Sequence, residues 1–559
     1  MLLLLACTGN SVSLPPEVQD TAVEVEPDPT DFVYDAGRVI EVEIEMDPDD
    51  FEAMRKQERT FFDLLAGADC MDAPFAHPYT WFEADVTLDG DRFESVAIRK
   101  KGLIGSQEAT RPGIKLDLDD LVPDQRWHEV EHLTLNNTRQ DPSRLKTCMA
   151  FEIYEAAGIP ASRCNYAHVT VNGEELGLYS NVEPVKKQLL RREFGEDVGN
   201  LYEGTLSDFR EGWTQTFEDE WGGSDRQDLQ GVVEALEAPD DEVLDSLDEV
   251  VDVDAFIDAW ALEALIGHWD SYTANTNNFY AYADPQDGGR FHFIPWGVDA
   301  VLQGERPFGQ YAPLSVTGES VLAWRIYSTE EGQERYRDAL DGLLAEVWDE
   351  DHWLTRLDEM EQLTKSSMSD YEDKQYRREV IREMESFIEN RRDNVEDEWR
   401  NGPPTIDDTL RSEICMVQSG TMEVAFSTTV DSYGSENTFA YGEGTFSVEI
   451  QGVEYPVEFL GAVVGEYATG ESIFFMSGRL ESGEAVGYYA LAETEVFETA
   501  GEHPVDWKVV QAYLLYDSGN LNNWQVWAYL GDGTLSLEQT GEDRGDPWVG
   551  SSTTLVYAN

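Results

Sequence analysis

The sequence predicts an α+β domain followed by a separate all-β domain. Between about Arg38 and Arg400, segments with strand-like alternation are followed by segments with helical periodicity. The pattern changes at residues 401–404, Asn-Gly-Pro-Pro, and from about Cys415 to Asn559 alternating strands and Gly-rich turns predominate, which is typical of a sandwich or barrel. A chain of 559 residues is also too long for one hydrophobic core, so two or more domains are expected.

The N-terminal segment predicts a lipid anchor and a linker. Met1 to Cys7 look like the end of a bacterial lipoprotein signal peptide, because Ala6 precedes Cys7 at the end of an apolar run. The basic start and longer apolar stretch of a full signal peptide are missing, so we expect the true start upstream, lipid on Cys7 and a place at the bacterial surface or periplasm. An ordinary short apolar N-terminus is the alternative. The expected parts are a signal remnant (1–7), an acidic Pro-rich linker (8–32), the α+β domain (33–400), a second linker (401–412) and the all-β domain (413–559).

The first half of the α+β domain is expected to be mostly strands. Residues 39–46 alternate as a strand does, and Asp47 is the expected cap of a short helix. Asp89-Gly90 and Asn172-Gly173 each stand between two alternating runs, which predicts a hairpin turn at both places. A helix is expected from about Ser143 to Ala157.

The second half of that domain is expected to be mostly helical. Residues 226–268 follow a helical pattern, with Asp254 as the expected N-cap of the last helix. Two strands follow, at about 278–284 and 290–296, and several amphipathic helices are expected over 318–400.

The chain is extremely acidic. Asp and Glu total 113 against 39 Lys and Arg, a formal net charge of −74, so nucleic acid and anionic membrane surfaces should repel it. Contact with a membrane is then expected only through Cys7. Solubility in a salty or extracellular medium explains the acidity, and a basic partner or bound divalent cations are the alternative. No apolar stretch reaches the roughly 18 residues of a membrane span.

Four further cysteines show no spacing typical of a metal site: Cys70, Cys148, Cys164 and Cys415. In an exported protein one or two disulfides are expected, although the sequence does not pair them. Buried free thiols are the alternative.

Basic residues surround a Gly/Ser turn between residues 98 and 115. Arg99 precedes this turn, Ser106 lies in it, and Lys115 follows on the next strand, where alternation points it away from its apolar neighbours. Such a turn can present backbone N–H groups to phosphates, and a lysine can neutralise them. A solvated strand lysine is the alternative, and the absence of GxxxxGK[ST] excludes a Walker-type site.

An Asn-rich loop follows the helix that ends near His268. In phosphoryl transfer a loop Asp accepts the substrate hydroxyl proton while a nearby Asn holds magnesium, and Asp270 with Asn275 has a suitable spacing. Asn277 and Asn278 are also within reach of such a site. Asx-turn chemistry is the alternative for these residues, and His268 is expected to be a packing residue.

An aspartate also follows the second strand of the next hairpin. Kinase-like folds place a metal-binding acid there, and carboxylate and amide oxygens suit magnesium, so Asp299 is the candidate. A simple turn aspartate is the alternative.

Together these residues resemble the CotH family of kinase-like proteins. The resemblance runs in order from about residue 38 to 310, and its most specific stretch is 133–204, with Asp-Pro-Ser, Gly-Ile-Pro-Ala, Asn-Gly-x-x-x-Gly-Leu-Tyr and Asn-Leu-Tyr. It implies an atypical protein-kinase-like fold and ATP-dependent phosphorylation of serines in exported or coat proteins, with a divalent metal. The implied nucleotide-binding residues are Lys115, Arg99, Ser106 and Glu183 (which would orient Lys115), the implied catalytic residue is Asp270, and the implied ligands of Mg²⁺ or Mn²⁺ are Asn275, Asn277 or Asn278, and Asp299.

Two positions depart from the family pattern. Gly297 stands where the family usually has the first acid of Pro-Trp-Asp-x-Asp, and Glu203 stands where a lysine usually follows Asn-Leu-Tyr. Two functions are therefore expected as alternatives: an active protein serine kinase, or a surface protein that kept the kinase fold for binding or structure. A metal-dependent hydrolase is a third, but the chain has 8 His and no HExxH.

Overall fold

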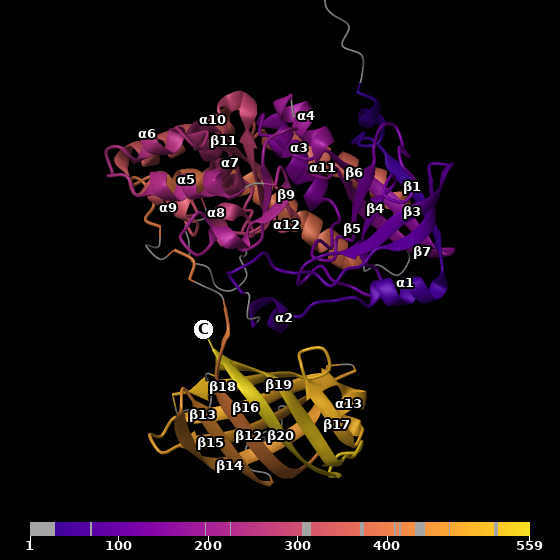
Figure 1. Cartoon of the computed structure of the whole chain (residues 1–559), viewed down its shortest axis with the longest axis vertical. Coiled ribbons are helices and arrows are strands. Elements are labelled where there is room, and N and C mark those ends of the chain that lie inside the picture. Colours follow the sequence, from indigo (N-terminus) through magenta and orange to yellow (C-terminus); the bar gives the residue numbers. More distant parts are fainter. Residues whose placement is uncertain are drawn as a thin grey trace, which may run out of the picture.

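The structure is a computed structural model. It describes residues 28–66, 70–195, 197–223, 225–304, 315–368, 374–406, 410–412, 415–430, 442–468, 470–518 and 524–558. Figure 1 shows two bodies joined by a narrow neck, with the C-terminal strands forming the smaller one. The expected lipidation site, Cys7, lies outside the described residues. Among the described residues, no helix combines the length and the apolar character that crossing a membrane requires.

The larger body begins with a closed β-barrel. Its strands are β1 (Val39–Met46), β2 (Phe82–Leu88), β3 (Asp91–Lys101), β4 (Gly113–Asp117), β5 (His132–Asn136), β6 (Cys164–Val171) and β7 (Glu174–Val182). They close in the order β1-β2-β3-β4-β5-β7-β6. The alternation read from the sequence is the alternation of burial: along β1 every second residue enters the barrel core. Both residues of Asp89-Gly90 and of Asn172-Gly173 have positive φ, so the two predicted hairpin turns are confirmed.

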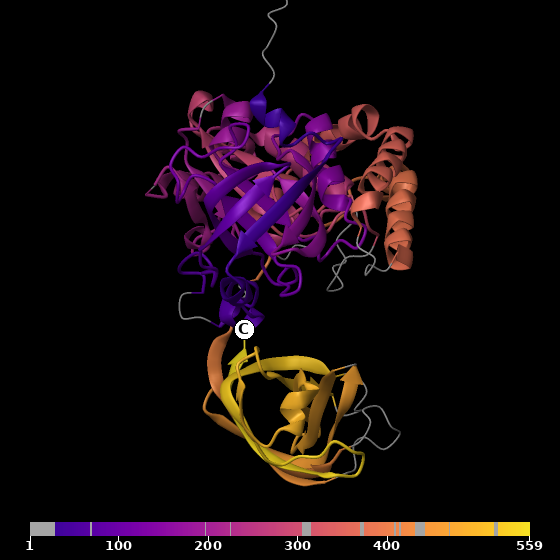
Figure 2. The ribbon, with the colours of Figure 1, turned by 90° about the vertical axis from the view of Figure 1, so that its right-hand side faces the viewer.

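The other half of the larger body is a small sheet surrounded by helices. Its strands are β8 (Leu201–Gly204), β9 (Glu218–Trp221), β10 (Phe279–Asp284) and β11 (Arg290–Pro295), in the order β11-β10-β8-β9. The helices of the larger body are α1 (Pro48–Arg55), α2 (Phe61–Leu65), α3 (Lys146–Ala156), α4 (Lys187–Phe194), α5 (Gln227–Leu236), α6 (Val243–Asp248), α7 (Val253–Leu265), α8 (Tyr272–Asn275), α9 (Val321–Tyr327), α10 (Glu330–Glu346), α11 (Glu350–Thr364) and α12 (Lys374–Trp399). Its short 3₁₀ helices are η1 (Pro29–Phe32), η2 (Thr214–Thr216), η3 (Pro285–Asp287) and η5 (Lys365–Ser367). In Figure 2 the orange helices α11 and α12 form an outer layer at one side.

Helix α7 leads into the loop that carries Asp270. Nearly all of its side chains are buried, and Trp260 packs 4.2 Å from the ring of Tyr336 on α10. The predicted N-cap, Asp254, is wrong by two residues. Asp252 is the cap, because its carboxylate accepts a hydrogen bond from the Ala255 N–H at 3.1 Å, whereas Asp254 pairs with Arg335 on the surface.

The smaller body is a β-barrel, one of the two architectures expected for this region. Its elements are β12 (Val417–Thr429), β13 (Glu443–Ile450), β14 (Val453–Ala468), β15 (Glu471–Leu480), β16 (Ala485–Glu493), α13 (Thr494–Glu498), β17 (Gly501–Val505), β18 (Gln511–Asp517), β19 (Gln525–Gln539) and β20 (Pro547–Ala558). Pairing of β20 with both β12 and β19 closes the ring. Trp548 stacks on Phe426 with ring centroids 4.8 Å apart, and Phe497 of α13 packs on Trp548, so aromatic side chains contribute to the core of this barrel.

The two bodies are joined through α2 and a disulfide. Phe62 packs on Trp507 and Tyr557 of the C-terminal barrel, within a cluster shared by both bodies. A disulfide links Cys70 to Cys415 close by, and a second links Cys148 to Cys164. The four cysteines are therefore paired, which settles the alternative of free thiols.

Candidate active site

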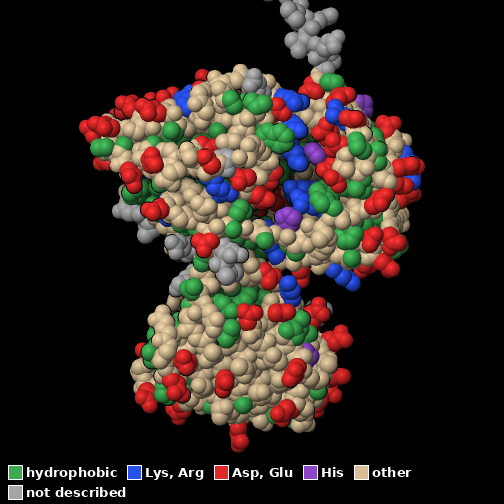
Figure 3. Space-filling view, viewed as in Figure 1, with side chains coloured by type: hydrophobic (Ala, Val, Ile, Leu, Met, Phe, Trp, Pro, Cys, Tyr) green, Lys and Arg blue, Asp and Glu red, His purple; other side chains and the backbone are tan. Residues whose placement is uncertain are grey.

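A cavity of about 180 Å³ lies between the first barrel and the helical half of the larger body. Figure 3 shows Lys, Arg and His side chains gathered in a hollow on this face, between acidic patches. Seven of the candidate site residues selected from the sequence line the cavity: Arg99, Ser106, Lys115, Asp270, Asn277, Asn278 and Asp299.

Strands β3 and β4 supply a basic wall to this cavity. Arg99 lies directly opposite Lys115 in the antiparallel pair, so both side chains leave the sheet on the same face. Lys101, two residues after Arg99, shares this face and lines the cavity, with its Nζ 5.6 Å from the centre of the Trp296 ring. Burial, together with the nearby charge of Lys115, lowers the pKa of Lys101 to about 8. Sequence reasoning missed Lys101, although the alternation from Arg99 could have found it.

The turn with Ser106 is closed by its own hydroxyl. Ser106 Oγ donates to the Leu103 carbonyl at 2.9 Å and accepts from the Leu103 N–H at 3.0 Å. Asn137 in turn donates to the Ser106 carbonyl at 2.9 Å. The turn is thereby held compact beside the basic wall.

The Asp270 carboxylate is held by three asparagine amides. Asn275 and Asn277 donate to Oδ1, and Asn278 donates to Oδ2 at 2.7 Å and to the backbone carbonyl at 3.0 Å. Burial raises the pKa of Asp270, while the three amides and the charge of Arg411 oppose that rise. The Asx-turn alternative alone does not account for three side-chain donors to one carboxylate.

Asp299 is a second carboxylate in the same cavity. It is 8% exposed. Burial, followed by the negative charges of Asp270 and Asp141, raises its pKa to about 7, and Lys101 partly offsets this. Two desolvated carboxylates so close are a costly arrangement that a cation would relieve.

Comparisons with known proteins identify the family of this chain. The family model described as CotH kinase protein matches residues 98–395, more than half of the chain. The chain belongs to the CotH kinase family. It is 22% identical over 236 residues to the inner spore coat protein H of Bacillus subtilis (strain 168), a match covering 39% of this chain and 64% of that protein.

More distant relatives are fungal. Spore coat protein homolog 1 of Rhizopus delemar is 21% identical over 193 residues, covering 32% of this chain and 31% of that protein, and invasin CotH2 of the same organism is 20% identical over 190 residues, covering 31% and 32%. The chain therefore spans less than two thirds of the length of these curated relatives. Among solved structures, the Helicobacter pylori proinflammatory kinase CtkA matches with a TM-score of 0.28 and 10% identity, covering 51% of this chain and 91% of that chain.

Gly297, which departs from the family pattern, lies against the side chain of Asn278. Gly297 has φ +53°, and Asn278 Oδ1 faces the place that a side chain there would occupy. Asp299 lines the cavity although position 297 is a glycine. Of the two acids in the Pro-Trp-Asp-x-Asp pattern expected from the resemblance, the second is therefore present in the site.

Asn275 has a role other than the one predicted. Its Nδ2 donates a hydrogen bond to Asp270, and its Oδ1 accepts one from Arg411. Both ends of the amide therefore have protein partners, which does not fit the predicted role of a metal ligand. Asn275 does not line the cavity, whereas Asn277 and Asn278 do. Arg411 belongs to the predicted linker, and no local pattern marked it.

The prediction that Glu183 orients Lys115 is wrong. Glu183 is 1% exposed and binds Arg163 at 2.7 Å and Arg192 at 2.6 Å, away from the cavity. A buried carboxylate needs such partners, and two guanidiniums satisfy it. Glu203 lines the cavity instead, and burial raises its pKa to about 6, an effect that the charge of Lys115 opposes.

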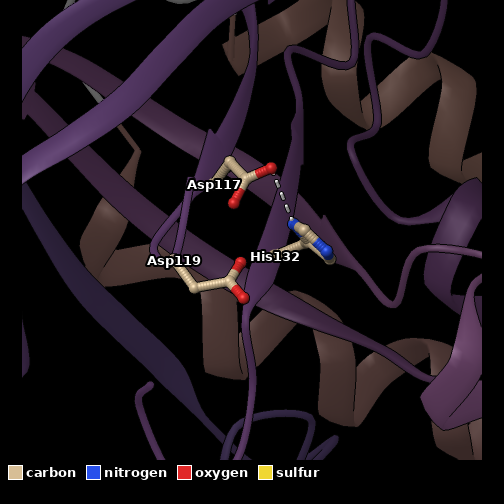
Figure 4. A group of neighbouring side chains, drawn as sticks. All are labelled: Asp117, Asp119 and His132. Carbon is tan, nitrogen blue, oxygen red and sulfur yellow. Dashed lines mark ion pairs between the residues drawn. The ribbon is translucent and has the colours of Figure 1, made fainter. Parts of the chain in front are cut away.

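The cavity continues along β4 and β5 into a second hollow. This hollow shares Lys115 and Trp296 with the first, and Val185 and Tyr280 add apolar surface. At its rim Asp117, Asp119 and His132 face one another, with His132 Nδ1 3.2 Å from Asp117 Oδ2 (Figure 4). Since His132 already pairs with Asp117, we interpret this group as a structural ion pair.

Proposed function

We propose that this protein is a protein serine kinase that uses ATP with Mg²⁺ or Mn²⁺ and acts on exported or surface proteins. One observation carries the proposal: a single cavity is lined by a wall of three basic side chains and by two carboxylates. The basic wall consists of Arg99, Lys101 and Lys115, and the carboxylates are Asp270 and Asp299. Phosphoryl transfer needs both parts, a cationic support for the phosphates and oxygen ligands for a metal.

The donor set fits a hard divalent cation. Asp299 and Asn278 offer oxygen atoms at the cavity, and these two residues, with Asp270 beside them, would hold the ion. Burial and the charges of Asp270 and Asp141 raise the pKa of Asp299, and Lys101 offsets only part of this rise, so a bound cation would favour its charged form. When bound, the ion supplies charge neutralisation to the phosphate oxygens.

Within this site Asp270 would act as the general base. The substrate serine hydroxyl would give its proton to the Asp270 carboxylate as its oxygen bonds to the γ-phosphorus, and the bond from phosphorus to the bridging oxygen would break to release ADP. The buried setting raises the pKa of Asp270, which makes it a better proton acceptor than a solvated aspartate. Lys101, Lys115 and Arg99 would hold the phosphates.

The second hollow is a suitable place for the nucleotide base. It begins at Lys115, next to the proposed phosphate position, and Trp296, Tyr280 and Val185 offer aromatic and aliphatic surface. Cofactor pockets commonly combine such apolar walls with a few polar groups. We place the base here and the phosphates along the basic wall.

Two further properties bear on location and substrate. The Cys70–Cys415 and Cys148–Cys164 disulfides favour an oxidising compartment, which supports export, with the lipid on Cys7 as its proposed anchor. Glu218 lines the cavity, and the chain carries a net charge of −74, which together favour a basic segment around the acceptor serine.

The test is phosphate transfer and thermal stability of the full chain with Mg·ATP and Mn·ATP, using a basic serine peptide as acceptor. We expect the wild type to melt at higher temperature with nucleotide and to label the peptide. Asp270→Asn should lose labelling but keep the thermal shift, and Asp299→Asn should lose both. Asp124→Asn, whose side chain is 94% exposed, is the matched control and should behave as the wild type.

Gly297 supports a second candidate function. If the missing family acid is essential, the protein is a kinase-like surface protein without catalysis. The absence of any thermal shift or labelling with either metal, in preparations that fold normally, would favour that second function over the first.

A further inference from the structure

The linker between α12 and the C-terminal barrel runs along the loop that carries Asp270. The Arg411 N–H donates to the Glu319 carbonyl at 3.1 Å, and the Glu319 N–H donates to the Thr273 carbonyl at 2.9 Å. Three segments far apart in the sequence are thus joined by backbone hydrogen bonds. At Arg411 the linker is therefore bonded to the segments that form the site.

The side chain of Arg411 reaches from this linker into the Asp270 loop. Its guanidinium donates to Asn275 Oδ1 and lies 3.8 Å from a Glu319 carboxylate oxygen, and its side chain is 22% exposed. Asn275 then donates from Nδ2 to Asp270 Oδ1. Since an amide has one accepting end and one donating end, an arginine at Oδ1 leaves only Nδ2 for the carboxylate.

A few residues later the chain is bonded to the region of α2, just before the C-terminal barrel begins. Cys415 forms the disulfide with Cys70, and the Met416 N–H donates to the Leu65 carbonyl of α2 at 2.7 Å. Helix α2 is the element that packs on the barrel through Phe62. The described residues on either side of this junction, Arg411 and Cys415, are therefore both bonded to the larger body.

We propose that Arg411 is a positioning residue: held by Glu319, it fixes the Asn275 amide and thereby the orientation of the Asp270 carboxylate. The proposal rests on the proposed kinase function only in calling this loop catalytic. It assigns to the linker before the C-terminal barrel a part in building the site. Arg411 acts on Asp270 through Asn275 and is not a catalytic residue.

The first arm of the test does not depend on catalysis. Hydrogen–deuterium exchange of the full chain is compared between the wild type, Arg411→Ala, Arg411→Lys and the control Arg400→Ala, whose side chain is 66% exposed near the same linker. We expect Arg411→Ala to speed exchange in peptides covering residues 270–278 at least fivefold, with β3, β4 and the C-terminal barrel unchanged. Arg411→Lys should restore part of the protection, because a lysine can still donate to Asn275.

The second arm uses phosphate transfer. If Arg411 positions the carboxylate, Arg411→Ala should lower kcat about tenfold or more while the KM for ATP stays within twofold, and Arg411→Lys should recover part of kcat. A purely structural role would instead lower the amount of folded protein and leave kcat per folded molecule unchanged. Should Arg411→Ala fail to fold, Arg411→Gln, which keeps a donor of shorter reach, takes its place in both arms.

The two arms separate this proposal from the proposed function. A wild type that transfers no phosphate contradicts the kinase proposal, and the exchange arm then decides the role of Arg411. Exchange over 270–278 in the Arg411 variants that equals that of Arg400→Ala would overturn the positioning proposal, whatever the activity.

Discussion

Gly297 lies directly against the side chain of Asn278, because a Cβ at position 297 would stand 2.3 Å from Asn278 Oδ1. Asn278 cannot easily move away, since its Nδ2 donates to both the carbonyl and the carboxylate of Asp270. The backbone of Gly297 is also in the left-handed region, with φ +53°. A glycine at position 297 therefore suits this loop both in its backbone conformation and in the space beside Asn278.

Restoring the family acid at this position should not restore a metal site. We expect Gly297→Asp and Gly297→Ala each to lower stability by about 1–2 kcal/mol, through steric conflict with Asn278 and a less favourable backbone. Neither variant should bind Mn²⁺ more tightly than the wild type. Calorimetric titration with Mn²⁺ and denaturant unfolding measure the two effects, and Gly304→Ala, where a Cβ meets no neighbour, is the control. A tenfold gain in Mn²⁺ affinity for Gly297→Asp would contradict this account.

Lys101 should contribute to nucleotide binding at least as much as Lys115. Removing a desolvated cation beside the phosphates should weaken binding of Mg·ATP roughly tenfold or more, so Lys101→Met should lose most of the nucleotide-induced thermal shift. Since the pKa of Lys101 is lowered to about 8, wild-type affinity should fall between pH 7 and 9, and this fall should be smaller in Lys101→Met. Lys56→Met, with a side chain 69% exposed, serves as control. Equal affinities of Lys101→Met and Lys56→Met would exclude this role.

The parts of the structure that depend on local chemistry could be predicted from the sequence. Asp89-Gly90 forms a hairpin because both residues accept positive φ, and Lys115 leaves the barrel because strand side chains alternate. Lys115 and Asp270, which lie in separate segments of the sequence, line the same cavity. Their grouping into one site was predicted from the resemblance to a known family and not from local patterns.

The parts that depend on contacts between distant segments could not be predicted. Glu183 looked like a partner for Lys115, but the folded chain brings two guanidiniums to it, those of Arg163 and Arg192. Arg411 carries no local signal, because its place beside Asn275 follows from how the linker packs on the loop. The expected N-cap of α7 was likewise displaced by two residues, because two aspartates, Asp252 and Asp254, stand at the start of that helix.

Glu263 should make stability depend on pH. It is buried and accepts hydrogen bonds from the hydroxyl and N–H of Thr273, and burial raises its pKa to about 7 from 4.5 despite those bonds. The folded protein then holds a proton that the unfolded chain releases, so the contribution of Glu263 to stability falls as pH rises from about 4.5 to 7. Glu263→Gln stays neutral and keeps an acceptor for Thr273.

We therefore expect Glu263→Gln to gain stability relative to the wild type on going from pH 5 to pH 8. The relative gain should be about 1–3 kcal/mol, given roughly 1.4 kcal/mol for each unit of pKa. Denaturant unfolding at several pH values measures it. Glu331→Gln, on a side chain 71% exposed, should follow the wild-type profile. Parallel profiles for Glu263→Gln and the wild type would contradict the prediction.

Docking of the C-terminal barrel should depend on Gly531 as well as on the disulfide. A Cβ at Gly531 would lie 2.4 Å from the Phe62 ring, so only glycine lets β19 approach α2 this closely. The disulfide between Cys70 and Cys415 holds the same junction. Gly531→Leu should therefore displace Phe62 yet leave the barrels tethered, while Cys70→Ser with Cys415→Ser should leave them docked through Phe62.

Only the combination of Gly531→Leu with both serine substitutions should release the barrel. Loss of a buried phenylalanine contact costs about 3–5 kcal/mol, enough to undo docking once the covalent link is gone. Small-angle scattering should then show a larger radius of gyration, with each barrel still folded by circular dichroism. Gly342→Leu, where a Cβ meets no neighbour and the backbone is not left-handed, replaces Gly531→Leu in the control combination and should stay compact. A compact triple variant would mean that contacts other than Phe62 hold the two bodies together.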